Sequence, residues 1–258
     1  MFKDIFETLS KANQFLVFGF QDIKVRYRRS PIGVFWITIN MAISIIVLSF
    51  VFGVLFNTPI KDYIPYLSIG LILWGFVSTN VNESCTLFIS AKENILNLKM
   101  NYSFYILRAL WRNIIILAHN MLIIPIVFLI FQKSLSPTIL YFIPGFILLI
   151  LNLTWMMLLI AIICTRYRDV SQIVLNIMQI LFYLTPIIWL QESFKNAFIS
   201  EVFSLNPFYH LLSITRSPLL GQIPSSNNWI ASIVFLIIGS IITSLFFTRF
   251  KHKIAYWL

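Results

Sequence analysis

Residues 139–163 read ILYFIPGFILLILNLTWMMLLIAII and contain no acidic or basic side chain. A helix needs about 20 apolar residues to cross the hydrocarbon core of a bilayer, so this stretch is long enough to span. Five further apolar stretches follow the same pattern, at residues 34–56, 64–90, 114–131, 170–190 and 229–248. The sequence therefore predicts an all-α membrane protein with six transmembrane helices.

Lysine and arginine residues gather in alternate gaps between these stretches. Of the 19 basic residues, only Lys61, Lys133, Lys195 and Arg216 fall in the other gaps. Basic residues mark the cytoplasmic side of a membrane protein. We therefore expect a multi-pass protein with both termini in the cytoplasm.

Composition excludes several classes of function. The chain is 59% hydrophobic and only 11% charged, so its net charge of +10 fits lipid headgroups better than a nucleic-acid partner. Two cysteines and three histidines show no metal-ligand spacing, and the chain lacks an ATP-binding G-x-x-x-x-G-K-[ST] loop. It also lacks the usual hydrolase motifs and a pair of neighbouring carboxylates. We predict no cofactor in this chain and no enzymatic activity.

The N-terminal segment and the gap at 91–113 are both expected to carry short helices outside the spans. Residues 2–20 are amphipathic, which is typical of a helix in the membrane interface or of one folded onto cytoplasmic protein. Pro31 suits the first turn of span one. Residues 92–99 predict a helix that exposes Ile95, Leu96 and Leu98. Such a helix is either a docking surface or a plain interfacial helix.

Several spans carry polar residues. Glu83 lies in span two and is a functional candidate, unless it reaches water or pairs with Arg108 or Arg112. His119 and Asn120 in span three favour hydrogen bonds across helices over a proton relay. Span five carries a continuous polar stripe, at spacings that place its members on one helix face. The stripe consists of Gln172, Asn176, Gln179 and Tyr183. Pore lining and helix packing both remain open for it. Thr185-Pro186 is expected to kink the outer end of that helix.

The segment 191–228 is rich in Phe, Leu and Tyr, although neither half is long enough to span. Pro207 disfavours helical geometry at Asn206 and divides the segment. We expect a re-entrant pair of short helices on the extracytoplasmic side, packed on protein.

Four passages and the tail resemble one known family. They are 26–36, 107–120, 165–170, 206–221 and 249–258. The chain resembles the membrane subunit of type-2 ABC exporters, and most closely the permeases that export O-antigen. The resemblance covers nearly the whole chain and implies one transmembrane domain over 1–258. Its parts would be an interfacial helix and elbow (1–30), spans one to five (31–190), gate helices (191–228), and span six with a cytoplasmic tail (229–258).

The resemblance also implies partners and a location. They are a homodimer of this chain, two cytoplasmic ATP-binding-cassette ATPase subunits that bind ATP and Mg, and a polysaccharide on undecaprenyl diphosphate in the bacterial inner membrane. Coupling to the ATPase is expected from Lys92, Glu93, Asn94, Ile95, Leu96 and Leu98, with Arg166 and Asp169 as a second contact. The expected gate residues are Phe203, Phe208, Tyr209 and Leu212.

The remaining site residues concern the substrate path. Channel lining is predicted for Phe35, Trp36, Phe52, Phe56, Phe76, Asn80 and the polar stripe of span five, with aromatic rings that could stack on sugars. Arg26, Arg28 and Arg29 are expected either to bind the lipid diphosphate or to anchor at headgroups. Export of capsule or teichoic acid, a stand-alone membrane transferase, and a proton-coupled transporter using Glu83 and His119 stay as alternatives.

Overall fold

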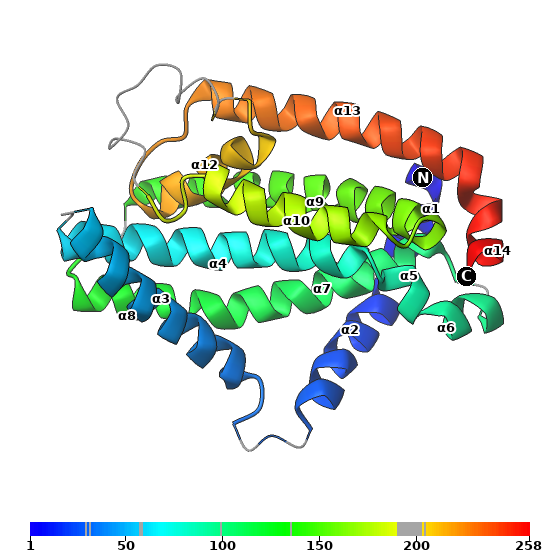
Figure 1. The fold of residues 1–258 in the computed structure, drawn as a ribbon, viewed down its shortest axis with the longest axis horizontal. Helices are drawn as coiled ribbons and strands as arrows, with labels where there is room; N and C mark the ends of the chain where they lie inside the picture. The colour runs from blue at the N-terminus through cyan, green and yellow to red at the C-terminus, as the bar shows by residue number, and fades with distance from the viewer. Residues whose placement is uncertain are drawn as a thin grey trace.

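The apolar stretches form long helices that lie side by side in the computed structural model (Figure 1). The structure describes residues 1–28, 30, 32–56, 59–98, 100–134, 136–189, 203 and 205–258, and these residues contain no strand. Both termini lie at the same end of the bundle as helix α6 (Lys92–Asn97), which we call the α6 end. The opposite end carries α12 (Pro207–Leu219) and is called the α12 end.

Five helices in the described part of the chain are long and apolar enough to cross a membrane. This confirms the all-helical membrane class and the positions of spans one, four and six to within a few residues. The helices and their short extensions are α3 (Phe35–Leu55), α4 (Ile60–Ser84), α7 (Tyr102–Met121) with α8 (Ile123–Ile130), η1 (Pro137–Tyr141) with α9 (Phe142–Arg166), and α13 (Ser226–Phe250) with η3 (Lys251–Lys253) and α14 (Ile254–Trp257).

The predicted fifth span is shorter than expected. Helix α10 (Val170–Leu184) has 15 residues. At 1.5 Å per residue it is about 22 Å long, which is less than the roughly 30 Å of a bilayer core. Proline disfavours helical geometry in the residue before it, and Thr185 is extended, with a ψ of 135°. Pro186 therefore ends this helix instead of kinking it, and a sixth full-length span is not confirmed.

The boundaries predicted for spans two and three are also corrected. Helix α4 ends at Ser84, and a separate turn, α5 (Leu87–Ser90), follows it. Helix α7 begins at Tyr102, so half of the supposed 91–113 loop is already helical. Proline clashes with the carbonyl of the residue four positions earlier. Pro125 makes that clash with Met121, where α7 ends and α8 takes over.

The N-terminal segment forms two helices, α1 (Phe2–Ser10) and α2 (Ala12–Tyr27). Helix α2 packs on α7, and α1 is tied to the start of α7 by Asp4. The Asp4 carboxylate is buried and accepts hydrogen bonds from the backbone N–H of Ser103 at 3.1 Å and from its hydroxyl at 2.7 Å. Lys251 forms an ion pair with the same carboxylate at 2.9 Å. One buried acid thus joins residues from both ends of the chain.

Helix α4 is the centre of the bundle and contacts α3, α7, α9, α10 and α12. In its span 67% of the residues are buried, compared with 17% in α3 and 22% in α13. The core is formed by apolar side chains such as Leu67, Ile72, Leu149 and Leu153, all at most 1% exposed. The outer faces of α3 and α13 are therefore left for lipid or for another protein.

Candidate functional site

Helix α6 presents apolar side chains to the outside at the α6 end of the bundle. Leu96 and Leu98 are 52% and 49% exposed, whereas Ile95 is half-buried against the core. The polar residues Lys92, Glu93 and Asn94 are exposed as well. The predicted helix is therefore present but ends at Asn97, and the exposed apolar residues are Leu96 and, just after the helix, Leu98, whereas Ile95 is not exposed.

The C-terminal segment joins α6 to the connection between α9 and α10. Lys92 donates a hydrogen bond to the backbone carbonyl of Leu258. On the other side, the Arg166 guanidinium lies 5.2 Å from the ring centre of Trp257 and 5.9 Å from that of Phe250. Asp169, the second residue predicted for that connection, is exposed just before α10. The two predicted coupling regions thus flank one C-terminal segment, a contact that sequence patterns gave no means of predicting.

A cluster of charged residues joins α2, α4 and α7 near the same end. Arg112 forms ion pairs with Glu83 and, at 3.7 Å, with Asp22. Arg108 binds the Asp22 carboxylate through two N–H groups, at 2.9 and 2.5 Å. The side chains of Arg112, Asp22 and Glu83 are only 13%, 22% and 27% exposed. Such pairs hold helices together because removing one partner leaves a poorly hydrated charge behind.

Two asparagines extend this cluster into the bundle. The Asn113 amide donates to the Glu83 carboxylate at 2.9 Å and to the Asn80 side-chain oxygen at 3.1 Å. Asn80 is fully buried and donates to the carbonyl of Phe76 at 2.7 Å. Glu83 therefore pairs with Arg112, one of the two arginines that the sequence offered. Asp22 is a member that the sequence analysis missed, although its position four residues before Arg26 marks it as a charged neighbour of that helix face.

Replacing Glu83 by alanine is expected to destabilise the chain by about 2 kcal/mol, because Arg112 then keeps only the longer contact to Asp22. The measurement is the midpoint of unfolding of the purified chain in detergent. Glu93→Ala serves as the control, since Glu93 is an exposed acid on α6. Equal losses in the two variants would contradict a structural role for the cluster.

Within the described residues, neither His119 nor Asn120 makes the predicted hydrogen bond across helices. The Nδ1 atom of His119 lies 2.8 Å from the carbonyl of Ile115 in its own helix. Its ring packs edge-on against Phe35 of α3, at 5.9 Å between centres. The side-chain oxygen of Asn120 is buried and has no hydrogen-bond partner in the described part of the chain. An aromatic contact replaces the expected hydrogen bond at His119.

The polar stripe of α10 faces away from the rest of the chain. All four members, Gln172, Asn176, Gln179 and Tyr183, are exposed, while Met178 on the opposite side is buried against the bundle. Gln172 donates to the Asn176 oxygen at 3.5 Å, within the stripe itself. Because lipid cannot satisfy amide groups, this exposed stripe needs water or a second protein surface.

The other predicted channel residues divide into an exposed, a half-buried and a buried group. Phe35 and Trp36 are 55% and 43% exposed on α3. Phe52 and Phe56 are half-buried and stack on each other at 5.8 Å between ring centres. Phe76 is 5% exposed, and like Asn80 it lies inside the bundle. Phe76 and Asn80 are therefore too buried to line a channel that runs along the outside of this chain.

The predicted diphosphate and gate residues lie at opposite ends. Arg26 and Arg28 are exposed at the end of α2, and Arg26 comes within 3.9 Å of Glu83. Arg29 lies outside the described residues, as do residues 191–202 and 204 of the gate segment. The described gate residues Phe203, Phe208 and Leu212 are buried and Tyr209 is half-buried. Helix α12 begins at Pro207, and Asn206 is its N-terminal cap.

A comparison with protein families decides which group of proteins shares these features. The family model described as ABC-2 type transporter matches residues 13–220, which include α2 to α12. The chain belongs to the ABC-2 type transporter family. It is therefore the multi-pass membrane component of a transporter, and such a component works with an ATP-binding cassette subunit.

Curated relatives of this ABC-2 type transporter carry a consistent name. Two proteins of Klebsiella pneumoniae, each named O-antigen export system permease protein RfbA, are 23% and 22% identical to it over 242 and 246 residues, covering 91% of both chains. A Myxococcus xanthus protein of the same name is 22% identical over 199 residues, covering 75% of each chain. The match extends over nearly the whole length of the two Klebsiella pneumoniae relatives, and the family resemblance stated from the sequence is confirmed.

Proposed function

We propose that this chain is the permease subunit of an ATP-driven exporter that moves O-antigen polysaccharide, linked to undecaprenyl diphosphate, across the bacterial inner membrane. The observation that supports this most is the alignment with O-antigen export permeases over 91% of both chains. The family membership supplies the transport class, and the lipid-linked substrate and the ATP-driven mechanism are the proposed parts.

The proposed coupling element is α6 together with the C-terminal segment beside it. Exposed Leu96 and Leu98 offer an apolar contact, and the neighbouring basic groups Lys92 and Lys253 favour an acidic partner surface. Two ATPase subunits would bind ATP and Mg and push on α6 when they close. Arg166 would transmit that movement to α9 and α10, because it already packs against Trp257.

The proposed path for the polysaccharide lies between two copies of this chain. A twofold interface is the commonest form of oligomer. It would place the exposed stripe of α10 and the aromatic residues Phe35 and Trp36 of α3 against a second copy or against the sugar chain. In this arrangement the amides of Gln172, Asn176 and Gln179 hydrogen-bond to sugar hydroxyls. Arg26 and Arg28 are proposed to receive the diphosphate, with both termini in the cytoplasm.

Observations on the structure count against one of the alternatives, the proton-coupled transporter. A proton-coupled transporter needs Glu83 and His119 as free proton carriers, but Glu83 is held by Arg112 and Asn113. His119 contacts its own backbone and Phe35. Capsule and teichoic acid remain rival substrates within the same family, because nothing in the aromatic or amide surface selects one polymer.

The test is deletion of the gene in its native host, followed by analysis of surface polysaccharides and of lipid-linked polymer inside the cell. We expect the surface O-antigen to disappear and its lipid-linked form to accumulate, because synthesis continues while export stops. Affinity purification of the tagged chain should recover an ATPase in equal amounts. If capsule or teichoic acid is lost instead of O-antigen, that polymer is the substrate. Unchanged surface polysaccharides, together with no ATPase recovered with the tagged chain, would refute the proposal.

A further inference from the structure

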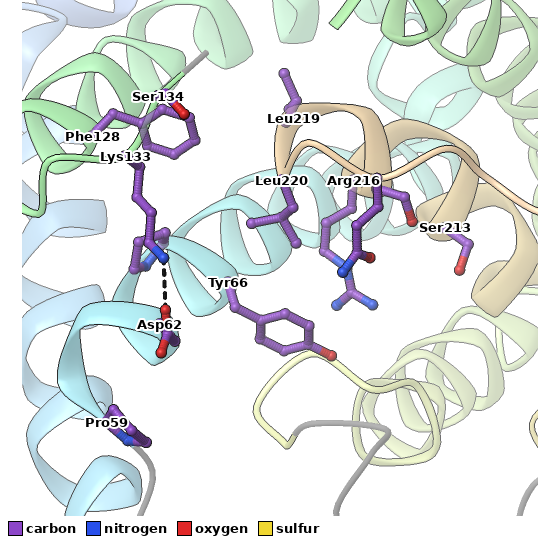
Figure 2. Close-up of a pocket in the computed structure, with 13 residues that line it drawn as sticks. Pro59, Asp62, Tyr66, Phe128, Lys133, Ser134, Ser213, Arg216, Leu219 and Leu220 are labelled. Carbon is purple, nitrogen blue, oxygen red and sulfur yellow. Dashed lines mark hydrogen bonds and ion pairs between the residues drawn. The ribbon is translucent and has the colours of Figure 1, made fainter. Parts of the chain in front are cut away.

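A cavity at the α12 end of the bundle is lined by none of the predicted channel residues. It measures about 740 Å³ and is formed by the start of α4, the end of α8 with the residues after it, and the end of α12. Figure 2 shows Tyr66 lying between the Asp62–Lys133 pair and Arg216. Hydroxyl and amide groups complete the lining, from Ser134, Ser213, Ser217 and Gln222.

Arg216 gives this cavity its positive charge. Arg216 is only 6% exposed. One N–H group of its guanidinium donates a hydrogen bond to the backbone carbonyl of Pro186 at 2.5 Å. The guanidinium lies 4.3 Å from the ring centre of Tyr66. Within the residues that the structure describes, no carboxylate forms an ion pair with it. A guanidinium has five N–H donors, so one carbonyl and one ring leave it under-compensated for its burial.

The other charges of the cavity cancel. Lys133 and Asp62 form an ion pair at 2.6 Å. One carboxylate against two cations leaves a net charge of +1 in the lining, and that charge is the one on Arg216. An arginine fork in a site with hydroxyl and amide donors matches the oxygens of a phosphate group.

We propose that this cavity binds the phosphate-bearing polar head of a lipid or a free diphosphate at the α12 end of the bundle. The cavity lies where membrane helices begin and end, which is the depth of lipid headgroups. A neutral sugar fits less well, because the carboxylate of Asp62 is engaged by Lys133 and the Tyr66 ring is covered by Arg216. This site is separate from the proposed coupling and diphosphate residues at the α6 end.

The test measures binding of radiolabelled pyrophosphate to the full chain in a detergent without phosphate groups. Arg216→Gln is expected to weaken binding at least about 10-fold, because the charge-assisted hydrogen bonds are lost. Since Arg216 also holds Pro186, Ser217→Phe provides a second variant that fills the cavity and leaves the arginine in place; it should weaken binding similarly. Lys61→Gln is the matched control, because it removes an exposed charge from the first turn of α4 outside the cavity.

The source of the phosphate follows from the same assay in nanodiscs. If a bilayer headgroup fills the site, phosphatidylglycerol discs should block pyrophosphate, while discs of digalactosyl diacylglycerol, which has no phosphate, should not. If pyrophosphate binds equally in both kinds of disc, the headgroup does not occupy the site, and a free diphosphate is the ligand. Absence of saturable binding in detergent, equal binding by Arg216→Gln and the wild type, or equal loss in Lys61→Gln would overturn the proposal. None of these results depends on ATP hydrolysis. Their failure would therefore leave the proposed export function untouched, and that function is tested by its own experiment.

Discussion

Leu96→Asp should reduce export at least about 30-fold while the chain still folds and inserts. Leu96 is half exposed on α6, so the new carboxylate meets water in the free chain but faces an apolar contact in the proposed complex. Residues at the centre of an interface commonly contribute 2 kcal/mol or more, which corresponds to about that factor. The measurement is surface O-antigen in cells that carry only the variant, with ATPase activity of the purified complex alongside.

The matched control for this prediction is Asn97→Asp, which adds the same charge to the same helix without removing an apolar side chain. It should export at nearly the wild-type rate. Ile95→Asp is a poorer test, because Ile95 is half-buried against the core and its loss would disturb the fold as well as the contact. Unchanged export by Leu96→Asp would exclude α6 as the coupling element and leave the family membership intact.

Gly145→Ala should prevent stable folding. A Cβ atom on Gly145 of α9 would lie 2.5 Å from the backbone carbonyl oxygen of Ile214 in α12. Small residues let membrane helices approach this closely, and here the obstacle is backbone that cannot rotate away. Overpacking of this kind costs about 3 kcal/mol. We expect a large drop in the yield of monodisperse protein and in its unfolding midpoint.

Gly53→Ala is the control for the packing prediction. Its added Cβ would meet nothing closer than a Tyr63 ring atom at 3.7 Å, which is an ordinary contact. Both substitutions place one methyl group in a membrane helix, so a difference between them isolates the contact of α9 with α12. Equal stability of the two variants would mean that α12 can shift away from α9 at little cost.

Hydropathy predicted where helices lie but not where they end. Residues 35–55 and 226–250 carry long apolar runs, and their helices appear nearly as expected. Helix α7 was missed between Tyr102 and Asn113 because Arg108 and Arg112 look like loop residues until Asp22 and Glu83 neutralise them. Helix α10 was overestimated because the residues after Pro186 are apolar without being helical.

The candidate sites were predictable to the extent that they depend on local pattern. The exposed side of α6 and the stripe of α10 follow from residue spacing within one helix. The contact of Lys92 with Leu258, the aromatic neighbours of Arg166 and the isolated charge of Arg216 all join segments far apart in the chain. Such contacts depend on how helices pack, and a single sequence carries no periodicity that reveals them.

The position of Asp4 has a consequence for the order in which the protein is made. The partners of Asp4, which are Ser103 and Lys251, are synthesised 99 and 247 positions after it. Until then its carboxylate must stay in water or at the membrane surface, because burial without a partner is unfavourable. Helix α1 can therefore settle against α7 only after Ser103 has been made, and a chain interrupted before Lys251 lacks the cation that neutralises this buried acid.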